Sequence, residues 1–284
     1  MKCELINNVQ ENIEVQCYSQ ATKQAYIFHI KNFLKSYHND LKQENILKYL
    51  FYLRTEKNYS PSTLNIAKAS LIYFFEKGLN QKITINIPII KREKPLPKPI
   101  DREIIIKLIN NTINIKHKVL IELLYSSGLR LAEIVKVKWG DIDLLNKTIR
   151  VNKGKGSKDR ISILSDEVIK HLLILNDIKI KDNDFVFFSN TRNSTHISKK
   201  TVQKVLANAS KKADIGYIVT PHQIRHSFAT HSLENGIDIR IIQHLLGHAS
   251  PKTTMLYTKV TKRNLSKISN PLDLTIKEHR EGVV

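Results

Sequence analysis

Six side chains in the second half of the chain are of the types that could hold a phosphodiester and cleave it. In chain order they are Arg130, Lys155, His222, Arg225, His248 and Tyr257. Attack by an oxygen adds negative charge to the equatorial oxygens of a phosphate, and guanidinium groups bind such oxygens as planar, permanently cationic forks. The set therefore indicates a tyrosine nucleophile that works among cations.

Arg130 and Arg225 are the predicted phosphate ligands. His222 lies three residues before Arg225, so on a helix the two share a face and can address one phosphate together. A histidine there can donate a hydrogen bond or move a proton near neutral pH. We expect His248 to donate to a nonbridging oxygen. Glu133 is expected to orient the Arg130 guanidinium or fix a histidine, unless it is simply a salt-bridge partner on a helix.

Lys155 stands between two glycines in a segment that we expect to be a turn between strands. A flexible ammonium on such a turn can reach a leaving oxygen and give it a proton. Lys153 and Lys158 lie on the same turn and compete for this role. A turn of Gly and Lys is also commonly a solvated loop that contacts the backbone of DNA.

Tyr257 is the predicted nucleophile. A tyrosine hydroxyl has an unperturbed pKa of about 10, so it reacts only beside a base or cations that favour the phenolate. Of the ten tyrosines in the chain, most, such as Tyr26 and Tyr73, fall in apolar helical patterns that packing explains. Tyr257 differs because it follows His248 and the expected helix start at Ser250, although core packing stays the alternative role.

A zinc site is the competing interpretation of the histidines. His222 and His226 have the i, i+4 spacing of a zinc-binding helix. However, Gln223 replaces the catalytic glutamate of that motif, and Arg225 would put a fixed positive charge among the ligands of a dication. We therefore expect neither a metal nor another cofactor, and we interpret His226 and His231 as structural.

The charge balance points to a polyanionic partner. The chain of 284 residues has 46 Lys and Arg against 26 Asp and Glu, a formal net charge of +20, which favours nucleic acid. A membrane partner is not expected, because neither a polybasic run nor an apolar stretch of spanning length stands out. The polar N-terminus does not resemble a secretory signal. Two cysteines offer no disulfide framework, which fits a cytoplasmic location.

The first third of the chain is predicted to be helical. Apolar residues recur with helical spacing over about residues 18–37 and 46–53, and Ser60-Pro61-Ser62 begins a third helix that runs through Phe75. Three prolines among charges then predict an extended linker. The expected division is a helical domain at 1–92, a linker at 93–99, a catalytic domain at 100–270 and a tail at 271–284.

The predicted catalytic domain mixes helices with a small sheet. Asp101 is expected to cap a first helix, and a second runs from about Ile115 to Tyr125 and ends at Gly128. Arg130 would lie in the first turn of the next helix, where free N–H groups favour an anion. Two β-prone segments, 148–151 and 160–163, predict an antiparallel pair. Further helices are expected at 201–212, 223–233 and 238–246.

The order of these motifs resembles the tyrosine recombinase (integrase) family, most closely its two-domain Xer-like members. Residues 128–133 resemble the first arginine box, 154–160 the β-turn lysine segment, 221–231 the second box and 246–248 the third. Tyr257 stands where the family keeps its nucleophile. The resemblance covers about residues 127–257, and the N-terminal half is similar in type to the family's SAM-like core-binding domain.

The resemblance implies a mainly α fold with a small antiparallel β-sheet, formed by a helical core-binding domain and an α+β catalytic domain. It also implies site-specific DNA recombination. Tyr257 would attack one strand of duplex DNA and form a 3′-phosphotyrosyl bond, with Lys155 as the general acid for the departing 5′-hydroxyl. Four protomers would exchange strands on a recombination site, so we expect a homotetramer on DNA and a monomer or dimer without it. The tail could dock on a neighbouring protomer, and an accessory protein could license the reaction.

Among family roles, an Xer-like resolvase of chromosome or plasmid dimers, acting in chromosome partition, is favoured. We expect no arm-binding domain of the kind found in some phage integrases, because few residues precede residue 18. The alternative is a mobile-element or phage integrase of the same chemistry. More distant alternatives are a type IB-like topoisomerase that relaxes supercoils as a monomer, and a non-enzymatic DNA-binding protein on the same scaffold.

Overall fold

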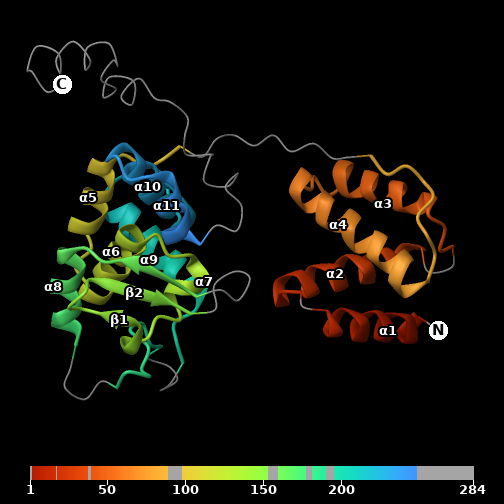
Figure 1. Cartoon of the computed structure of the whole chain (residues 1–284). Helices are drawn as coiled ribbons and strands as arrows, with labels where there is room; N and C mark the ends of the chain where they lie inside the picture. Colours follow the sequence, from red (N-terminus) through yellow and green to blue (C-terminus); the bar gives the residue numbers. More distant parts are fainter. Residues whose placement is uncertain are drawn as a thin grey trace, which may run out of the picture. The chain divides into compact units, whose positions relative to one another are not determined.

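The computed structural model describes residues 2–16, 18–37, 40–88, 98–152, 159–176, 181–189 and 195–247. The chain divides into two compact units, residues 1–95 and 96–284 (Figure 1). The division falls between Pro95 and Leu96, and the linker predicted at 93–99 lies mostly outside the described residues. No helix among the described residues is long and apolar enough to cross a membrane.

Helices and one π-helical turn make up the first unit, as far as its described residues go. The elements are α1 (Lys2–Val15), α2 (Gln20–Tyr37), α3 (Glu44–Thr55), α4 (Pro61–Tyr73) and the π-helical turn Phe74–Gly78. Three of the helices occupy the predicted segments. Ser60 caps α4 by accepting a hydrogen bond from the backbone N–H of Thr63, with Pro61 in the first turn, as the sequence indicated.

The first unit has its own hydrophobic core, in which α2 packs against α1 and α4. Phe33 of α2 is fully buried, and its ring lies 6.0 Å from the ring of Phe75, centroid to centroid. Helix α1 was missing from the sequence prediction. It buries Val9 and Ile13. So few apolar residues in a polar segment do not indicate a packed helix in the sequence.

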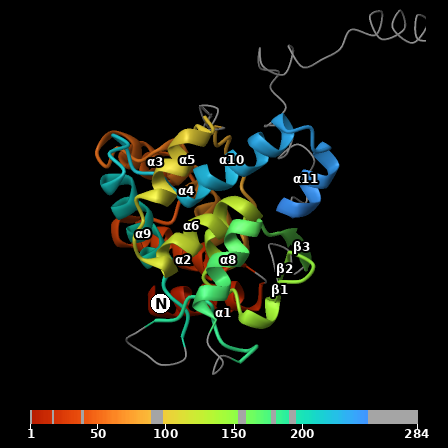
Figure 2. The ribbon, with the colours of Figure 1, turned by 90° about the vertical axis from the view of Figure 1, so that its left-hand side faces the viewer.

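The second unit contains the helices α5 (Arg102–Asn110), α6 (Ile115–Ser127), α7 (Leu131–Ile134), α8 (Asp166–Leu175), α9 (Lys199–Lys212), α10 (Pro221–Glu234) and α11 (Ile239–Leu246). Helix α6 is central, and α8, α9 and α10 surround it (Figure 2). Its buried residues include Leu120, Ile121, Leu123 and Leu124. Consecutive apolar positions cover every side of a helix, so the helix must be enclosed on all sides.

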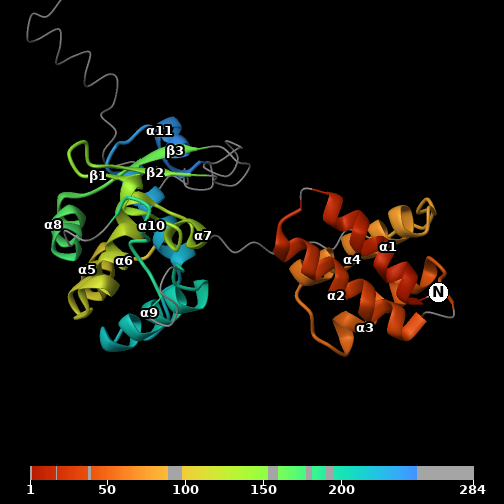
Figure 3. The same ribbon diagram turned by 90° about the horizontal axis from the view of Figure 1, so that it is seen from below.

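A three-stranded antiparallel sheet lies on one side of this unit. Its strands are β1 (Ile142–Asp143), β2 (Thr148–Val151) and β3 (Arg160–Ile163), in that order. The two longer strands occupy the residues predicted for them, and β1 is an addition. Val151, the last residue of β2, pairs with Arg160, the first residue of β3. Helix α11 runs beside β3 (Figure 3).

Two local expectations for this unit need correction. Arg130 is the N-cap of α7, not part of its first turn, and its backbone N–H donates to Glu133 Oε2 at 2.7 Å. That amide is therefore not available to an anion, because the carboxylate three residues on already satisfies it. Asp101 occupies the N-cap position of α5, but its side chain makes no capping hydrogen bond.

Gly128 ends α6 as predicted, with a left-handed φ of 60°. A Cβ atom added there would lie 2.5 Å from Cδ1 of Phe228 in α10. Both the backbone conformation and the space exclude a side chain. Gly128 thus lets the chain turn sharply toward Arg130 while α10 packs closely over it.

Candidate active site

Three guanidinium groups gather around the carboxylate of Glu133. Oε1 accepts hydrogen bonds from Arg130 Nη1 at 2.8 Å and from Arg160 Nη1 at 2.9 Å. Oε2 accepts one from Arg160 Nη2 at 2.7 Å, and Arg225 Nη1 lies 4.0 Å away from it. The structure thus brings the two predicted phosphate ligands, Arg130 and Arg225, together with Glu133 and with a third arginine. We call these four residues the arginine cluster.

The same three guanidinium groups hold the C-terminal end of α11. Arg160 Nε donates to the carbonyl of Leu245 at 2.8 Å, Arg225 Nη2 to that of Leu246 at 2.7 Å, and Arg130 Nη2 to that of Gly247 at 2.9 Å. A helix leaves its last carbonyls without partners and its C-terminus partly negative, so cations bind there. His248 directly follows this anchored segment in the chain.

Arg225 is more deeply engaged with the protein than the sequence suggested. Its Nη1 donates to the carbonyl of Gly128 at 2.6 Å, in addition to the bond from Nη2 to Leu246. It therefore bridges the ends of α6 and α11, where helix termini leave carbonyls unpaired. The Arg225 guanidinium, which we expected to bind a phosphate, thus donates to main-chain carbonyls. The Arg225 side chain is only 6% exposed.

The arginine cluster is strongly positive. Burial by itself raises the pKa of Glu133, but hydrogen bonds from Arg160 and Arg130 outweigh it and lower the pKa to about 2. The carboxylate is therefore ionised at neutral pH, and three guanidinium groups against one carboxylate leave a net charge of +2. The Arg130 side chain is 25% exposed. Arg130 is thus the member best placed to meet an anion from outside.

A groove of about 690 Å³ lies next to Arg130 and Glu133. Its lining includes the basic side chains of Lys136, Lys138 and Arg150, the last from β2. A concave surface lined by cations concentrates positive potential and attracts a polyanion. The groove therefore extends the positive surface of the cluster along the sheet.

His222 lies in the first turn of α10, one turn before Arg225, and is exposed. The two residues lie three positions apart on α10, but His222 is exposed whereas Arg225 is buried. His226 and His231 are buried, and Nδ1 of His231 shares a 2.8 Å hydrogen bond with the hydroxyl of Tyr125, which agrees with their structural interpretation. Within the described residues, no group of three or more His, Cys, Asp or Glu side chains could hold a metal ion.

Several predicted residues and one predicted segment lie outside the part of the chain that the structure describes: Lys155 with its competitors Lys153 and Lys158, His248, Tyr257, and the tail 271–284. Their chain neighbours are nevertheless placed. The strands that flank Lys155 in the sequence pair at Val151 and Arg160, and Gly247, the residue before His248, accepts a hydrogen bond from Arg130.

Arg160 was missed as a site residue by sequence reasoning. Along β3 the apolar Ile161 and Ile163 are exposed, while Arg160 and Ser162 are buried. Alternation with period two is visible in the sequence, but it does not say which face points inward. A strand that turns its charged residue toward the interior needs a partner there, and Glu133 is that partner.

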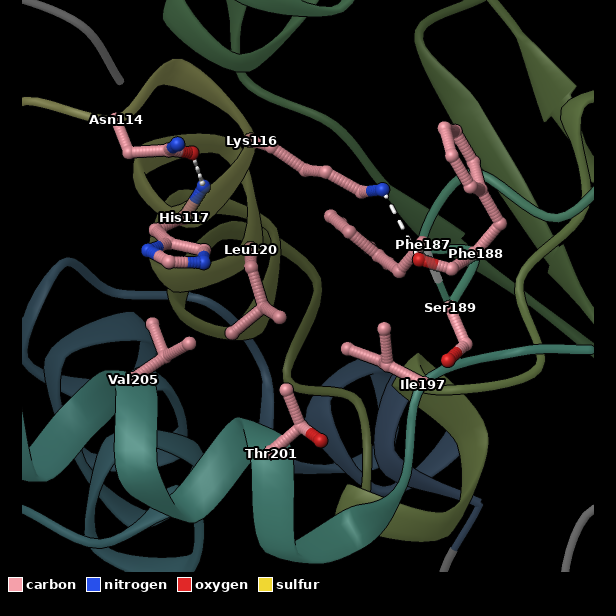
Figure 4. A pocket seen from close by; sticks show the side chains of 10 residues that line it. All are labelled: Asn114, Lys116, His117, Leu120, Phe187, Phe188, Ser189, Ile197, Thr201 and Val205. Atoms are coloured by element: carbon pink, nitrogen blue, oxygen red, sulfur yellow. Dashed lines mark hydrogen bonds between the residues drawn. The ribbon is translucent and has the colours of Figure 1, made fainter. Parts of the chain in front are cut away.

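A second hollow, of about 300 Å³, lies between α6, α9 and the segment around Phe188 (Figure 4). Lys116 reaches across it, with Nζ 3.4 Å from the centroid of the Phe188 ring and 3.1 Å from the Phe188 carbonyl oxygen. Burial lowers the pKa of Lys116. None of the predicted site residues lines this hollow, and we assign it no part in the chemistry.

Comparison with known proteins identifies the family. The family model described as phage integrase family matches residues 100–264, and the phage integrase N-terminal SAM-like domain matches residues 5–85. The chain belongs to the phage integrase family of tyrosine recombinases. This tyrosine recombinase is thus an enzyme that breaks and rejoins DNA, and the predicted fold class and recombinase chemistry are confirmed.

The similarity to individual recombinases extends over almost the whole chain. Tyrosine recombinase XerA of Pyrococcus furiosus is 35% identical over 94% of this chain and 93% of its own. A crystal structure of XerA recombinase matches with a TM-score of 0.54 and 31% identity over 98% of both chains. A pre-cleavage complex of XerH recombinase with its difH substrate, 21% identical, shares the fold with a TM-score of 0.66 over 86% of this chain and 78% of its own.

Proposed function

We propose that this recombinase is an Xer-type resolvase, which separates chromosome or plasmid dimers by cutting and rejoining duplex DNA at a specific site. The proposal is supported by the similarity to XerA along nearly the full length of both chains. The DNA in the XerH complex supports a duplex recombination site as the substrate. The net charge of +20 would supply much of the sequence-independent affinity for it.

The chemistry that we propose uses Arg130 and Arg225 to neutralise the scissile phosphate. Tyr257 Oη attacks the phosphorus, and the bond to the 5′ oxygen breaks as Lys155 protonates that oxygen. His222 moves the tyrosine proton, and His248 donates to a nonbridging oxygen. The 3′-phosphotyrosyl ester keeps the bond energy, so a 5′-hydroxyl from a partner duplex can reverse the step without ATP.

The observation that carries this proposal is the arginine cluster. Its net charge of +2 combines the two predicted phosphate ligands with the chain segment that leads directly to His248. Preorganised cations stabilise charge that develops on a phosphate without having to move during the reaction. Strand exchange between two duplexes further implies a homotetramer on DNA, formed from a free monomer or dimer. We also propose that the protein acts in the cytoplasm and that an accessory protein licenses the reaction.

The test begins by finding the site. The protein is incubated with the genomic DNA of its host in EDTA, protein is denatured with SDS, and covalently attached DNA ends are sequenced. A nicked duplex that carries the mapped site then serves as the cleavage substrate. We expect an adduct that survives denaturation, because ligation cannot follow once the short strand beyond the nick has diffused away.

Matched variants identify the acting residues. Tyr257→Phe should abolish the adduct and leave DNA affinity nearly unchanged, whereas Tyr217→Phe, which alters an exposed tyrosine of the same unit, should keep it. Arg130→Lys should slow cleavage far more than Arg150→Lys. An adduct that survives in Tyr257→Phe would identify another nucleophile.

Other outcomes decide between the remaining functions. Resolution of a head-to-tail plasmid dimer at the mapped site supports the resolvase, whereas joining of element ends alone favours a mobile-element integrase. Relaxation of plasmids that lack the site would indicate a topoisomerase. Failure to form an adduct with any genomic site would indicate a DNA-binding protein without recombinase activity.

A further inference from the structure

We propose that Arg160 is a positioning residue of the active site. It would hold Arg130, the strand ends that flank Lys155 in the sequence and the segment that leads to His248 in their correct relative places, without contacting the phosphate itself. The inference rests on the proposed function in one respect, because it takes these three residues as the groups that act on DNA.

The first link runs through Glu133 to Arg130. Arg160 binds both carboxylate oxygens of Glu133, at 2.9 Å and 2.7 Å. The same carboxylate accepts the guanidinium and the backbone N–H of Arg130. A bidentate pair fixes a carboxylate in plane and orientation, so Arg160 determines the direction in which Glu133 presents its oxygens to Arg130.

The second link runs to the end of α11. Nε of Arg160 donates to the Leu245 carbonyl at 2.8 Å. A Cβ atom on Gly247 would lie only 2.8 Å from Cδ of Arg160, and the φ of Gly247 is +60°. The glycine thus lets the Arg160 side chain pass directly beneath the main chain that continues into His248.

The third link is the backbone of Arg160 itself. Arg160 is the first residue of β3 and pairs with Val151, the last residue of β2. This pair fixes the two strand ends between which Lys155 lies in the sequence. Arg160 therefore contacts three parts of the site that are distant from one another in the sequence: the end of β2, the carboxylate that binds Arg130, and the end of α11.

Burial separates this role from direct phosphate binding. The side chain of Arg160 is 5% exposed, against 25% for Arg130, and its Nε, Nη1 and Nη2 all donate within the protein. A buried ion pair gives little net stability compared with apolar packing of the same volume. Orientation of the neighbouring groups therefore explains the arginine better than stability alone.

The experiment compares Arg160→Gln and Arg160→Lys with Arg102→Gln. Arg102 is the control because it also forms an ion pair, with Glu234 at 3.0 Å, in the same unit, and its hydrogen bonds go to His231, Glu234 and Asn235 rather than to the arginine cluster; its side chain is 37% exposed. The substrate is the nicked duplex carrying the mapped site. Three quantities are measured in the full-length protein: the single-turnover cleavage rate at saturating protein, the dissociation constant for the duplex, and the melting temperature.

We expect both Arg160 variants to cleave roughly 10- to 100-fold more slowly, because a displacement of about 1 Å in a reacting group can cost about that much. The dissociation constant should change by less than about threefold. Arg160→Lys should recover much of the melting temperature but not the rate, since an ammonium cannot bind both oxygens of Glu133 and the Leu245 carbonyl together. Arg102→Gln should lose stability and keep the rate.

Coupling to Glu133 provides the decisive readout. If Arg160 acts through that carboxylate, Arg160→Gln should slow cleavage little further in a Glu133→Gln background. Fully additive losses would overturn the inference, as would a wild-type rate in either Arg160 variant. Proportional losses of rate and melting temperature in all three single variants would reduce Arg160 to a structural residue.

A readout without DNA distinguishes failure of this inference from failure of the proposed function. The 15Nε signal of Arg130, observed by NMR in the full-length protein, should shift in Arg160→Lys and stay unchanged in Arg102→Gln. An unchanged signal in Arg160→Lys would refute the positioning role even if no cleavable site were found. A wild-type protein that forms no adduct would instead refute the recombination site or chemistry proposed above.

Discussion

Glu133→Gln removes the only carboxylate of the arginine cluster while keeping nearly the same side-chain shape. At neutral pH this leaves three guanidinium groups without their counter-charge, one of them, Arg160, with a side chain that is 5% exposed. Removing one partner of a buried pair leaves an uncompensated buried charge and is strongly destabilising. We therefore expect the variant to fold less stably and to lose the orientation of Arg130.

The size of the effect follows from the pKa of Glu133. Hydrogen bonds in the folded protein lower it to about 2 from an ordinary value of 4.5, which corresponds to about 3 kcal/mol of stability. Because the folded pKa is the lower one, this contribution is complete above about pH 4.5 and is lost as the pH falls toward 2. The variant should thus be about 3 kcal/mol less stable at pH 7, and the difference should shrink in acid.

The assay is urea unfolding at several pH values between 7 and 3. Trp139, the only tryptophan of the chain, lies in the second unit and reports on its unfolding by fluorescence. The free energies of unfolding of wild type and variant are subtracted at each pH, so that other carboxylates shared by both proteins cancel. Glu167→Gln is the control, because its exposed pair with Lys170 at 3.2 Å should contribute less than about 1 kcal/mol.

Two results would refute the reasoning. Equal stability of wild type and Glu133→Gln at pH 7 would mean that the carboxylate does not stabilise the cluster. A difference that stayed constant down to pH 3 would mean that the loss comes from altered packing and not from the charge of Glu133.

Two further predictions test the glycine turn and the basic groove. Gly128→Ala should destabilise the second unit by about 2 to 4 kcal/mol in the same urea assay, because it adds steric overlap with Phe228 to an unfavourable left-handed φ. Gly216→Ala, with a φ of +78° and nothing within 4 Å of the added Cβ, should cost only about 1 to 2 kcal/mol, and equal losses would contradict the overlap. Affinity for a random 30-base-pair duplex should fall linearly with salt on logarithmic axes, and Arg150→Gln should reduce that slope by about 1. A slope near zero would refute the idea that the positive charge binds the DNA backbone.

The elements of the fold could largely be predicted from local patterns. Apolar spacing located most of the helices, Ser60 and Gly128 marked the start of one and the end of another, and both longer strands lie where the β-prone segments predicted them. These features depend on residues within a few positions of one another, so they can be predicted from a single sequence. Helix α1 escaped prediction because its stability depends on packing against α2 and the turn at Phe74–Gly78, which no local pattern records.

The arrangement of the arginine cluster depended on the tertiary structure. The motifs predicted Arg130, Glu133 and Arg225 as site residues. They did not predict that guanidinium groups would donate hydrogen bonds to three successive carbonyls at the end of α11. Those carbonyls need partners only because the helix ends there, and the partners come from segments far away in the chain. Arg160 could be recognised only in the tertiary structure, for the same reason. The face of β3 that points inward is decided by what packs against it, which is Glu133 together with the end of α11.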